Sequence, residues 1–415
     1  MKFAHLADTH LGYRQYGLIE REKDFYEVFE KIINKIIEEK VDFVIHSGDL
    51  FETARPSPMA LLTFQKGLLK LKGAGIPVYA IAGNHDIVMR KGSIPPQVIF
   101  KKLGLKVLSN INPTYMHEDI FIAGLPYYPS SHVKSLKSKL SELSKKAANH
   151  EKSILIMHQG VDKYFGYQYE LEIGDIPDNF DYYALGHIHK YVNDNFGKGK
   201  LVYPGSTEIW KTSELPDYRE NGKGFVIVDF EGPKPLVNRI KIDTSREFID
   251  KKINYNDLDG AIERIKASIK DFDKKPILNL TIDEVDSDTS GIYDVIKDEL
   301  GDLALMIRPK FVMVGEKDID IIVDEQSKLG PKELLLQQLE GYGDSEVNKL
   351  AITLYDLLSK DKIDESRIVS DEFYSENYTN VNDLVEFKTE SVQKEEDSSD
   401  EEPDDLQVTF NEVLK

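Results

Sequence analysis

The chain has 415 residues, enough for two or three domains that each bury their own core. It contains no cysteine, which excludes disulfides and thiolate-bound metals and leaves His, Asp, Glu and Asn as possible metal ligands. Residues 1–250 carry a net charge of +1 and residues 251–415 one of −21, so the net charge of −20 still permits a basic face on the first part.

The N-terminus and the hydropathy pattern predict a cytoplasmic protein. Asp8 and His10 follow Met1 too closely for a signal peptide to precede them. No run approaches the about 20 apolar residues of a membrane-spanning helix. We therefore expect no membrane association.

Residues 1–245 alternate short apolar runs with helical patterns, which is typical of a layered α/β domain. Apolar residues of Arg21–Lys40 recur on one helical face, and Ser57–Leu71 and Ser131–Ala148 are further helix candidates. The predicted strands are Phe3–Ala7, Phe43–His46, Val78–Ala82, Ile120–Gly124, Ile154–His158, Tyr182–Gly186 and Phe225–Phe230.

Residues 246–325 are expected to form a small α+β unit without clusters of metal ligands. Residues 326–375 are expected to form a helical hairpin, because two amphipathic segments flank Gly341 and Gly343. The predicted helices there are Pro331–Glu340, Ser345–Ser359 and a third at Ser366–Tyr374. Residues 376–415 read as an acidic disordered tail that ends in a short apolar element, Leu406–Leu414.

Five predicted strand ends in the first domain carry residues of the kinds that bind metals. Nitrogen and oxygen donors without sulfur suit Mn, Fe, Zn or Mg. Because strand side chains alternate, Asp8 and His10 are expected to share one face, as are His187 and His189. Alone, Asp49 could be a turn former and His158 a structural histidine. The five segments are Asp8-Thr9-His10, Gly48-Asp49, Gly83-Asn84-His85-Asp86, His158-Gln159-Gly160 and Gly186-His187-Ile188-His189.

In this order the segments D-x-H, G-D, G-N-H-D, H and G-H-x-H resemble the signature of the calcineurin-like dinuclear metallophosphoesterases. The longer stretches AHLADTHLGYRQ, HSGDLFETARPS, IAGNHD, MHQG, YYALGHIHK and VYPGS are similar to those of the archaeal double-strand-break repair nucleases of the meiotic-recombination-eleven or SbcD type. The match covers about residues 3–206, and the later regions match only in layout. The resemblance implies a sandwich of two sheets flanked by helices, a small capping domain that recognises DNA, and a C-terminal helical segment.

The resemblance also assigns roles to residues of the five segments. His85 would act on the leaving group or stabilise the transition state. Glu52 stands where relatives often carry a His or Asn that steadies this histidine, so that support is left open, and Asp86 could either orient His85 or cap a helix. The first ion would be held by Asp8, His10, Asp49 and His189, and the second by Asp49, Asn84, His158 and His187.

Several polar residues next to these motifs are candidates for contacts to DNA phosphates, which would not read the base sequence. Each of them could equally be a solvated loop residue. The candidates are Tyr13, Arg14, Gln15, Arg55, Arg90, Lys91, Lys190 and Ser206.

The predicted function is a DNA nuclease with two Mn²⁺ per chain, Mg²⁺ being the alternative, that acts as a double-strand 3′–5′ exonuclease and single-strand endonuclease. The expected partners are double- and single-stranded DNA, a second copy of the chain, and an SMC-like coiled-coil ABC ATPase of the SbcC or radiation-sensitivity-fifty type. The ATPase would bind residues 331–375 or 406–414.

Two alternatives remain open from the sequence. A phosphatase or small phosphodiesterase would keep the metals, although GDLFETARP lacks the GDxxxRG form of protein phosphatases. A DNA-tethering scaffold without catalysis would need neither His85 nor the complete ligand set.

Overall fold

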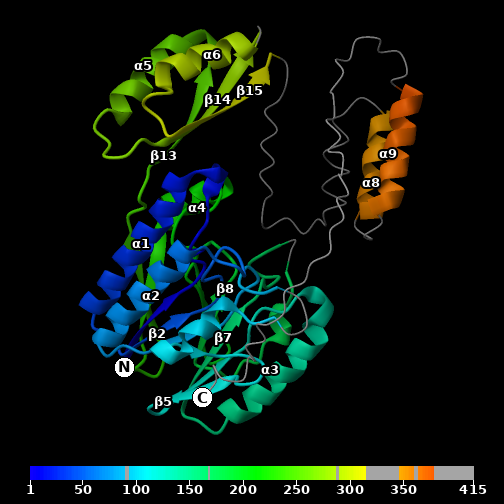
Figure 1. Ribbon diagram of the computed structural model, residues 1–415. Helices are drawn as coiled ribbons and strands as arrows, with labels where there is room; N and C mark the ends of the chain where they lie inside the picture. Colours follow the sequence, from blue (N-terminus) through cyan, green and yellow to red (C-terminus); the bar gives the residue numbers. More distant parts are fainter. Residues whose placement is uncertain (89–92, 167–168, 287–288, 315–344, 359–362, 378–415) are drawn as a thin grey trace, which may run out of the picture. The chain divides into compact units, whose positions relative to one another are not determined.

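The computed structural model describes residues 1–88, 93–166, 169–286, 289–314, 345–358 and 363–377 (Figure 1). The chain divides into two compact units, Met1–Lys328 and Leu329–Lys415. The predicted helix Pro331–Glu340, the acidic tail and its terminal apolar element lie outside the described residues. Among the helices of the described ranges, none combines the length and apolar character needed to cross a bilayer.

The first sheet is mixed and contains the strands that precede Asp8, Asp49 and Asn84. The four strands from the N-terminal part of the chain run parallel to one another. Two strands from later in the chain extend the sheet, and each is antiparallel to the strand before it in the sheet. In spatial order the strands are β12 (Leu236–Ile242), β11 (Lys223–Asp229), β1 (Lys2–Leu6), β2 (Phe43–His46), β3 (Val78–Ala80) and β4 (Lys106–Val107).

The second sheet contains the strands that precede His158 and His187. Four parallel strands form its centre, and one antiparallel strand borders them on each side. In spatial order the strands are β5 (Thr114–His117), β6 (Ile120–Gly124), β7 (Lys152–His158), β8 (Tyr182–Gly186), β10 (Gly199–Tyr203) and β9 (Val192–Phe196).

The two sheets pack face to face between layers of helix, which confirms the predicted sandwich. Helices α1 (Ile19–Glu38) and α2 (Pro58–Gly73) cover the outer face of the first sheet, and α3 (Val133–Ala147) covers that of the second. Phe3, Phe43 and Ile45 of the first sheet meet Ile154, Ile156 and Tyr182 of the second in a fully buried core. Burying each large apolar side chain contributes about 1.5–3 kcal/mol relative to leaving it exposed.

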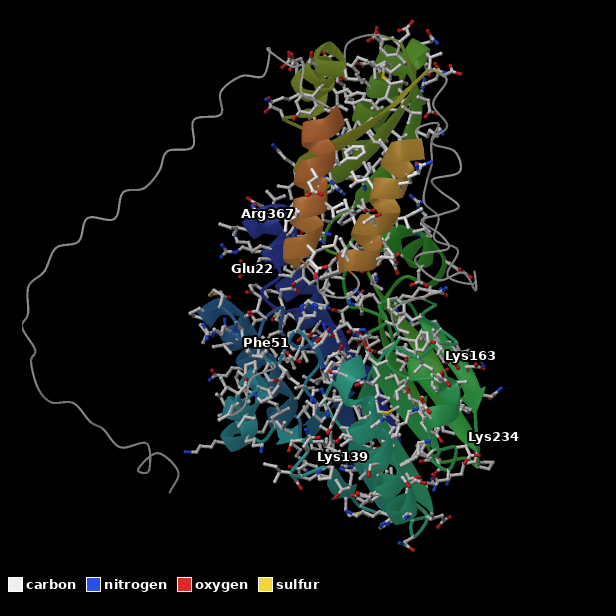
Figure 2. All side chains as sticks on the ribbon, turned by 90° about the vertical axis from the view of Figure 1, so that its right-hand side faces the viewer. Glu22, Phe51, Lys139, Lys163, Lys234 and Arg367 are labelled. Carbon is white, nitrogen blue, oxygen red and sulfur yellow. The ribbon has the colours of Figure 1, made fainter. Side chains whose placement is uncertain are left out.

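Aromatic packing joins the loop after β2 to the outer helices. Phe51, labelled in Figure 2, contacts Phe64 of α2 and Phe100 of η2 (Pro96–Leu103), with ring centroids 5.8 and 6.3 Å away. The loop that carries Asp49 is therefore anchored in the core beneath it. The remaining short helices of this part are η1 (Gln15–Gly17), η3 (Ser130–His132), η4 (Ile173–Asp175), η5 (Thr212–Glu214) and α4 (Leu215–Asn221).

Residues 248–313 form a separate three-stranded layer, the capping layer. Its strands are all parallel, in the order β13 (Phe248–Asn254), β14 (Ile277–Val285), β15 (Met306–Met313). A helix joins each pair of strands, α5 (Leu258–Ile269) and α6 (Thr289–Leu300), after the 3-10 turn η6 (Tyr255–Asp257). Because neighbouring parallel strands need a crossover, each pair is joined by a helix, and the layer is of the α/β type.

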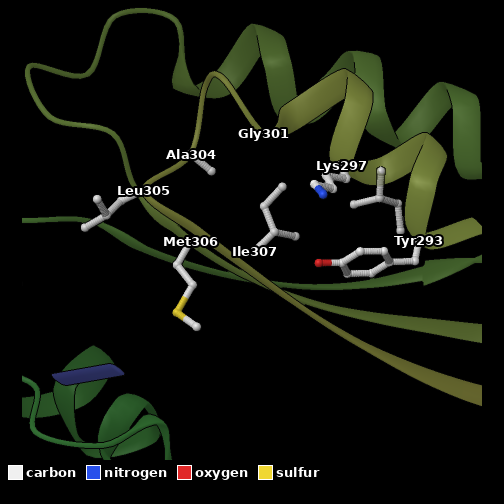
Figure 3. Close-up of a pocket in the computed structure, with 8 residues that line it drawn as sticks. Tyr293, Lys297, Gly301, Ala304, Leu305, Met306 and Ile307 are labelled. Carbon is white, nitrogen blue, oxygen red and sulfur yellow. The ribbon is translucent and has the colours of Figure 1, made fainter. Parts of the chain in front are cut away.

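A cavity of about 150 Å³ opens between α6 and β15 of the capping layer (Figure 3). Tyr293, Lys297, Met306 and Ile307 are among its lining residues. Lys297 is the one charged side chain in that lining, and the groups of metal-binding residues lie in the sandwich instead. The candidate metal site therefore lies in the sandwich and not at this cavity.

A buried ionic cluster connects α1 to the capping layer. Asp24 of α1 is fully buried and accepts hydrogen bonds from Arg21 Nη1 at 2.8 Å, Arg246 Nε at 2.8 Å and Lys274 Nζ at 3.0 Å. Arg246 begins the link to β13 and Lys274 precedes β14. A single carboxylate thus pairs with cations from three segments.

In the second unit, α8 (Ser345–Leu358) packs against α9 (Ile363–Asn377). The described hairpin therefore consists of the second and third predicted helices, and α9 is longer at both ends than Ser366–Tyr374.

Candidate metal centre

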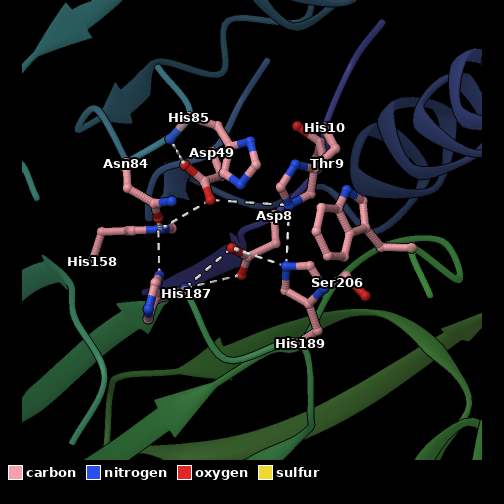
Figure 4. A network of polar contacts seen from close by, with 12 residues as sticks. Asp8, Thr9, His10, Asp49, Asn84, His85, His158, His187, His189 and Ser206 are labelled. Atoms are coloured by element: carbon pink, nitrogen blue, oxygen red, sulfur yellow. Dashed lines mark hydrogen bonds and ion pairs between the residues drawn. The ribbon is translucent and has the colours of Figure 1, made fainter. Parts of the chain in front are cut away.

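The loops after β1, β2, β3, β7 and β8 converge at one place, and they bring together all seven predicted ligands and His85 (Figure 4). Six of the seven predicted ligands form two groups of three, Asp8 with His10 and His189, and Asp49 with His158 and His187. Because parallel strands of both sheets end here, residues far apart in sequence become neighbours.

The first group surrounds a space between two histidine nitrogens and a carboxylate. His10 Nε2 lies 3.1 Å from His189 Nε2, and His189 Nε2 lies 3.9 Å from Asp8 Oδ1. The backbone N–H of His187 donates to Asp8 Oδ1 at 3.1 Å, which fixes the carboxylate. Asp49 Oδ2 completes the group at 4.0 Å from His10 Nε2.

The second group is tighter. Asn84 Oδ1 lies 2.9 Å from His187 Nδ1 and 3.1 Å from His158 Nε2. Asp49 Oδ2 lies 3.1 Å from the same His158 nitrogen. The other oxygen, Asp49 Oδ1, accepts the backbone N–H of His85 at 2.9 Å, so Oδ2 is left facing both groups. Asp49 is therefore placed as the shared residue.

These distances fit a cation better than they fit hydrogen bonds. Glu52 Oε2 accepts from His10 Nδ1 at 2.9 Å and Glu214 Oε1 accepts from His189 Nδ1 at 2.7 Å, so in the neutral rings both Nε2 atoms carry lone pairs. Two lone pairs 3.1 Å apart repel each other unless a proton or a metal cation lies between them. Donors about 2.1 Å from one ion and at right angles are about 3 Å apart. The residues present thus fit a pair of metal ions.

Four of the ligands have left-handed backbone conformations, with φ of 52° at Asp8, 44° at His10, 50° at Asp49 and 96° at His187. Such conformations cost about 1–3 kcal/mol each and persist where the surrounding fold enforces them. They also show that the alternation argument was wrong. β1 ends at Leu6 and β8 at Gly186, so the pairs converge through loop geometry and not through the two-residue period of a strand.

Glycines next to the ligands permit this close packing. A Cβ on Gly83 would lie 2.1 Å from Asp49 Oδ1, and one on Gly48 would lie 2.4 Å from His158 Nδ1. Gly48 also has a φ of 97°. No side chain fits at either position without displacing a ligand.

Electrostatics in the second group keep the shared carboxylate charged. Burial alone raises the pKa of Asp49, but the charge and hydrogen bond of His158 outweigh it and hold the pKa well below its usual value. Burial, followed by repulsion from His158, lowers the pKa of His187 to about 3, so this ring is neutral and able to bind a metal. His158 Nδ1 donates to the carbonyl oxygen of Ser47 at 2.7 Å, which directs Nε2 toward Asp49.

His85 is supported by the backbone of Glu52. Its Nδ1–H donates to the Glu52 carbonyl oxygen at 2.9 Å, while the Glu52 side-chain oxygen Oε1 is 3.7 Å away. The carboxylate of Glu52 instead serves His10, although the three side chains also form a third group of possible metal ligands. Glu52 therefore contacts His85 through its main-chain carbonyl oxygen, while its carboxylate bonds His10.

Asp86 bonds other groups than the two expected from the sequence, the His85 ring and the end of a helix. It is fully buried, and its carboxylate accepts the backbone N–H groups of Gly83, Leu50 and Phe51 at 3.0, 3.1 and 2.9 Å. Burial and the neighbouring charge of Asp49 raise its pKa to about 7. Asp86 therefore joins the Asn84 loop to the Asp49 loop and is not bonded to the His85 ring.

Comparison with known proteins agrees with this geometry. Residues 1–191 match the family model described as calcineurin-like phosphoesterase. The chain is 38% identical over 387 residues to the DNA double-strand break repair protein Mre11 of Methanocaldococcus jannaschii, which covers 90% of this chain and 99% of that protein. The chain belongs to the Mre11 family. It is accordingly a metal-dependent phosphoesterase, as the sequence predicted.

Other Mre11 proteins show the same relationship. The protein of Methanococcus maripaludis is 37% identical over 346 residues, 79% of this chain and 91% of that protein. That of Sulfolobus acidocaldarius is 37% identical over 291 residues, 68% and 75% of the two chains. The similarity to the Mre11 family thus extends well past the phosphoesterase domain.

The predicted DNA contacts of this Mre11-family chain fall into three classes. Arg14, Arg55 and Lys190 are exposed, and Tyr13 is half-buried. Gln15 and Ser206 are 1% and 0% exposed, and their polar atoms bond Trp210, Arg21, Glu208 and Glu214 within the fold. Arg90 and Lys91 lie outside the described residues. A DNA phosphate could reach the accessible side chains of Arg14, Arg55, Lys190 and Tyr13. It could not reach the buried side chains of Gln15 and Ser206.

Several residues of the centre carried no signal in the sequence. Glu214 and the buried Lys223 form an ion pair of 2.6 Å behind His189. Trp210 contacts the rings of three histidines, and Tyr127 lies against His187. None belongs to a metal-binding motif, so only the tertiary structure shows that they contact the site.

Proposed function

We propose that this chain is a nuclease of DNA double-strand break repair that uses two Mn²⁺ ions to hydrolyse phosphodiester bonds. The observation that carries the proposal is the position of Asp49 Oδ2 between the two donor groups, with His85 next to both. The names of the relatives, DNA double-strand break repair proteins, support DNA as the substrate.

The proposed chemistry divides between the ions and the protein. The two donor groups would hold two divalent ions, which would supply an activated water and neutralise charge on the phosphate. His85 has its Nδ1–H fixed by Glu52, so Nε2 is the nitrogen available to the departing oxygen. Proton donation by a positioned side chain typically contributes about 10²–10⁴ in rate.

The donor set supports Mn²⁺ over Mg²⁺. Four of the seven ligands are histidines, His10, His158, His187 and His189. Mg²⁺ prefers oxygen ligands and keeps several waters, whereas imidazole suits later divalent metals. The proposed activities are double-strand 3′–5′ exonuclease and single-strand endonuclease, in a cytoplasmic enzyme.

Arg55 and Lys190 are the proposed phosphate contacts, since both are exposed and follow loops that carry ligands. Tyr13 and Arg14 are further candidates, although Arg14 already pairs with Glu22. The proposed domain organisation remains 1–245 for the nuclease, 246–325 for the capping domain, 326–375 for the ATPase-binding segment and 376–415 for the tail.

One assay separates this proposal from its alternatives. The purified chain with Mn²⁺, and separately with Mg²⁺, is given labelled duplex DNA, single-stranded circles, bis-p-nitrophenyl phosphate and a phosphopeptide. Metal-dependent cleavage of both DNA substrates is expected. Cleavage of the small ester or phosphopeptide alone would favour a phosphatase or small phosphodiesterase, and cleavage of none would favour a tethering scaffold.

A further inference from the structure

Trp210, the only tryptophan in the chain, lies against the first donor group. Its ring centroid is 5.5 Å from that of His10, 5.3 Å from that of His189 and 5.8 Å from that of His85. Figure 4 shows the three imidazoles gathered on this side of the centre. The Trp210 side chain therefore contacts two residues of the first donor group. It also contacts His85, which is proposed to act on the leaving group.

The indole also donates a hydrogen bond to the carboxylate that orients His10. Trp210 Nε1–H donates to Glu52 Oε2 at 3.1 Å, and the same oxygen accepts from His10 Nδ1 at 2.9 Å. The second oxygen, Oε1, is 3.7 Å from His85 Nδ1. Glu52 thus lies between two histidines, and the indole N–H holds one of its oxygens on His10.

The main chain of Trp210 is fixed on both sides. Its N–H donates to Glu214 Oε2 at 3.2 Å, and the other oxygen of that carboxylate accepts from His189. Its carbonyl oxygen accepts from Gln15 Nε2 at 2.8 Å, and Gln15 is bonded in turn to the buried Arg21. The indole is therefore held rigidly enough to impose an orientation on its neighbours.

The second donor group is supported differently. His158 is oriented by the carbonyl oxygen of Ser47, and His187 lies against Tyr127 and Phe165. In the described part of the chain, the Trp210 ring contacts the rings of Tyr13, His10, His85 and His189 and the ammonium group of Lys211. None of these contacts is to His158 or His187. A change at Trp210 should consequently affect one ion and not the other.

We infer that Trp210 is a positioning residue for the first metal ion, acting through Glu52 and His10. The inference rests on the proposed two-metal site. The ring fixes the plane of His10, and the indole N–H keeps Glu52 on His10 Nδ1, so that Nε2 faces the ion. Changes to groups that orient metal ligands typically cost about 10–100-fold in metal affinity or activity.

The test is Mn²⁺ binding to the full chain, measured from the electron paramagnetic resonance signal of free Mn²⁺. Trp210→Phe keeps a ring but removes the N–H donor. It is expected to weaken one of the two ions by about 10-fold or more and to leave the other unchanged. Tyr79→Phe is the matched control, because it removes a hydroxyl bonded to His117 Nδ1, a histidine outside the centre. The control is expected to bind both ions as the wild type does.

A double-mutant cycle with Glu52→Gln tests the route. If Trp210 acts through Glu52, Trp210→Phe should cost much less affinity in the Glu52→Gln background than in the wild type. Glu52→Gln alone is expected to weaken the same ion, which keeps the inference testable if Trp210→Phe folds poorly. Thermal melting of each variant reports its folding.

The emission of Trp210 gives an independent readout in the wild type. Paramagnetic Mn²⁺ is expected to quench it, and Asp8→Asn, which removes a ligand of the first group alone, should require more Mn²⁺ for the same quenching. Unchanged affinity for both ions in Trp210→Phe, or equal losses in both backgrounds of the cycle, would overturn the inference. Failure of the wild type to cleave DNA while it binds two ions would remove the nuclease proposal and leave the role of Trp210 intact.

Discussion

Asp49 and His85 lie next to each other and are expected to have different roles. Asp49 Oδ2 faces both donor groups, whereas the main-chain N–H of His85 fixes Asp49 Oδ1 and the His85 ring bonds Glu52. Loss of Asp49 should therefore empty the centre, and loss of the His85 ring should leave it filled. The two substitutions separate metal binding from turnover.

We predict that His85→Gln lowers kcat by about 10²–10⁴ with unchanged Mn²⁺ content, because the ring supplies a proton and not a metal ligand. Asp49→Asn is expected to abolish cleavage and to lose bound Mn²⁺. Turnover of bis-p-nitrophenyl phosphate and metal analysis of the dialysed proteins check both. A metal-free His85→Gln protein would make His85 a ligand.

At the scale of elements, α1 links the sandwich to the capping layer through one carboxylate. Burial by itself raises the pKa of Asp24, but the hydrogen bond from Arg246, the charge of Arg21 and the bond from Lys274 outweigh it, and the pKa is lowered. The ionised carboxylate is thus favoured by folding. Its contribution to stability is present above the unfolded pKa of about 3.9 and is lost as the pH falls through the lower folded value.

Asp24→Asn is expected to destabilise the protein by about 3 kcal/mol at pH 7, since it leaves the buried guanidinium groups without their carboxylate. The difference in melting temperature from the wild type should shrink as the pH falls below about 4. Glu30→Gln is the control on the same helix, because its exposed pair with Lys70 contributes about 1 kcal/mol or less. A difference that stayed constant down to pH 3 would contradict this account.

The outer face of α2 and its neighbour η2 carry exposed apolar side chains, although Phe64 and Phe100 beneath them are buried in contact with each other. Met59 and Leu62 of α2 are 54% and 46% exposed, and Ile99 of η2 is 59% exposed. Ile94, which lies just before η2, is 67% exposed. Exposed apolar side chains of this size occur at interaction surfaces, and we propose that a second copy of the chain covers them.

Leu62→Glu should convert the proposed dimer into a monomer, because it places a charge within the apolar contact. Multi-angle light scattering of the purified full chain measures the mass. Leu236→Glu is the control, since Leu236 is 65% exposed on β12, away from this face. A wild-type chain that is already a monomer at micromolar concentration would remove the proposed interface.

At the scale of the whole molecule, the described part of the second unit, α8 and α9, buries few apolar side chains. Where burial is described in α8 and α9, Ser366 is the one fully buried residue, and the apolar Leu350, Leu354 and Leu357 are only half-buried. Leu358 and Ile368 are more than half exposed. A helical pair with this much accessible apolar surface fits the proposed docking of the ATPase partner, and such a helix presents anchors at i, i+4 and i+7.

Leu354→Glu is accordingly expected to weaken binding of the purified ATPase to the full chain by at least tenfold, with Mn²⁺-dependent cleavage of bis-p-nitrophenyl phosphate unchanged. Leu236→Glu again serves as the control substitution. Titration by isothermal calorimetry checks the affinity. Undiminished binding would direct attention to the other predicted docking element, Leu406–Leu414.

The motifs in the sequence, through the resemblance that they carry, implied the sandwich, which the structure confirms, and a ligand set, which stays a prediction. All seven predicted strands are present with bounds within two residues, because each is a short apolar run that ends in a polar turn. The seven ligands and His85 were predicted from local motifs, since each motif is contiguous in the chain. Motifs of this kind can be recognised without knowledge of the tertiary structure.

Only the tertiary structure decided what supports those ligands. Glu214 and Lys223 behind His189, Trp210 against His10, and the burial of Gln15 and Ser206 all depend on contacts between segments that no sequence pattern connects. The strained backbone at Asp8 and His10 likewise arises from the fold around it. The sequence names the atoms that can bind metal, but their orientation is fixed by packing and hydrogen bonds between residues up to about two hundred positions apart, which only the folded chain brings together.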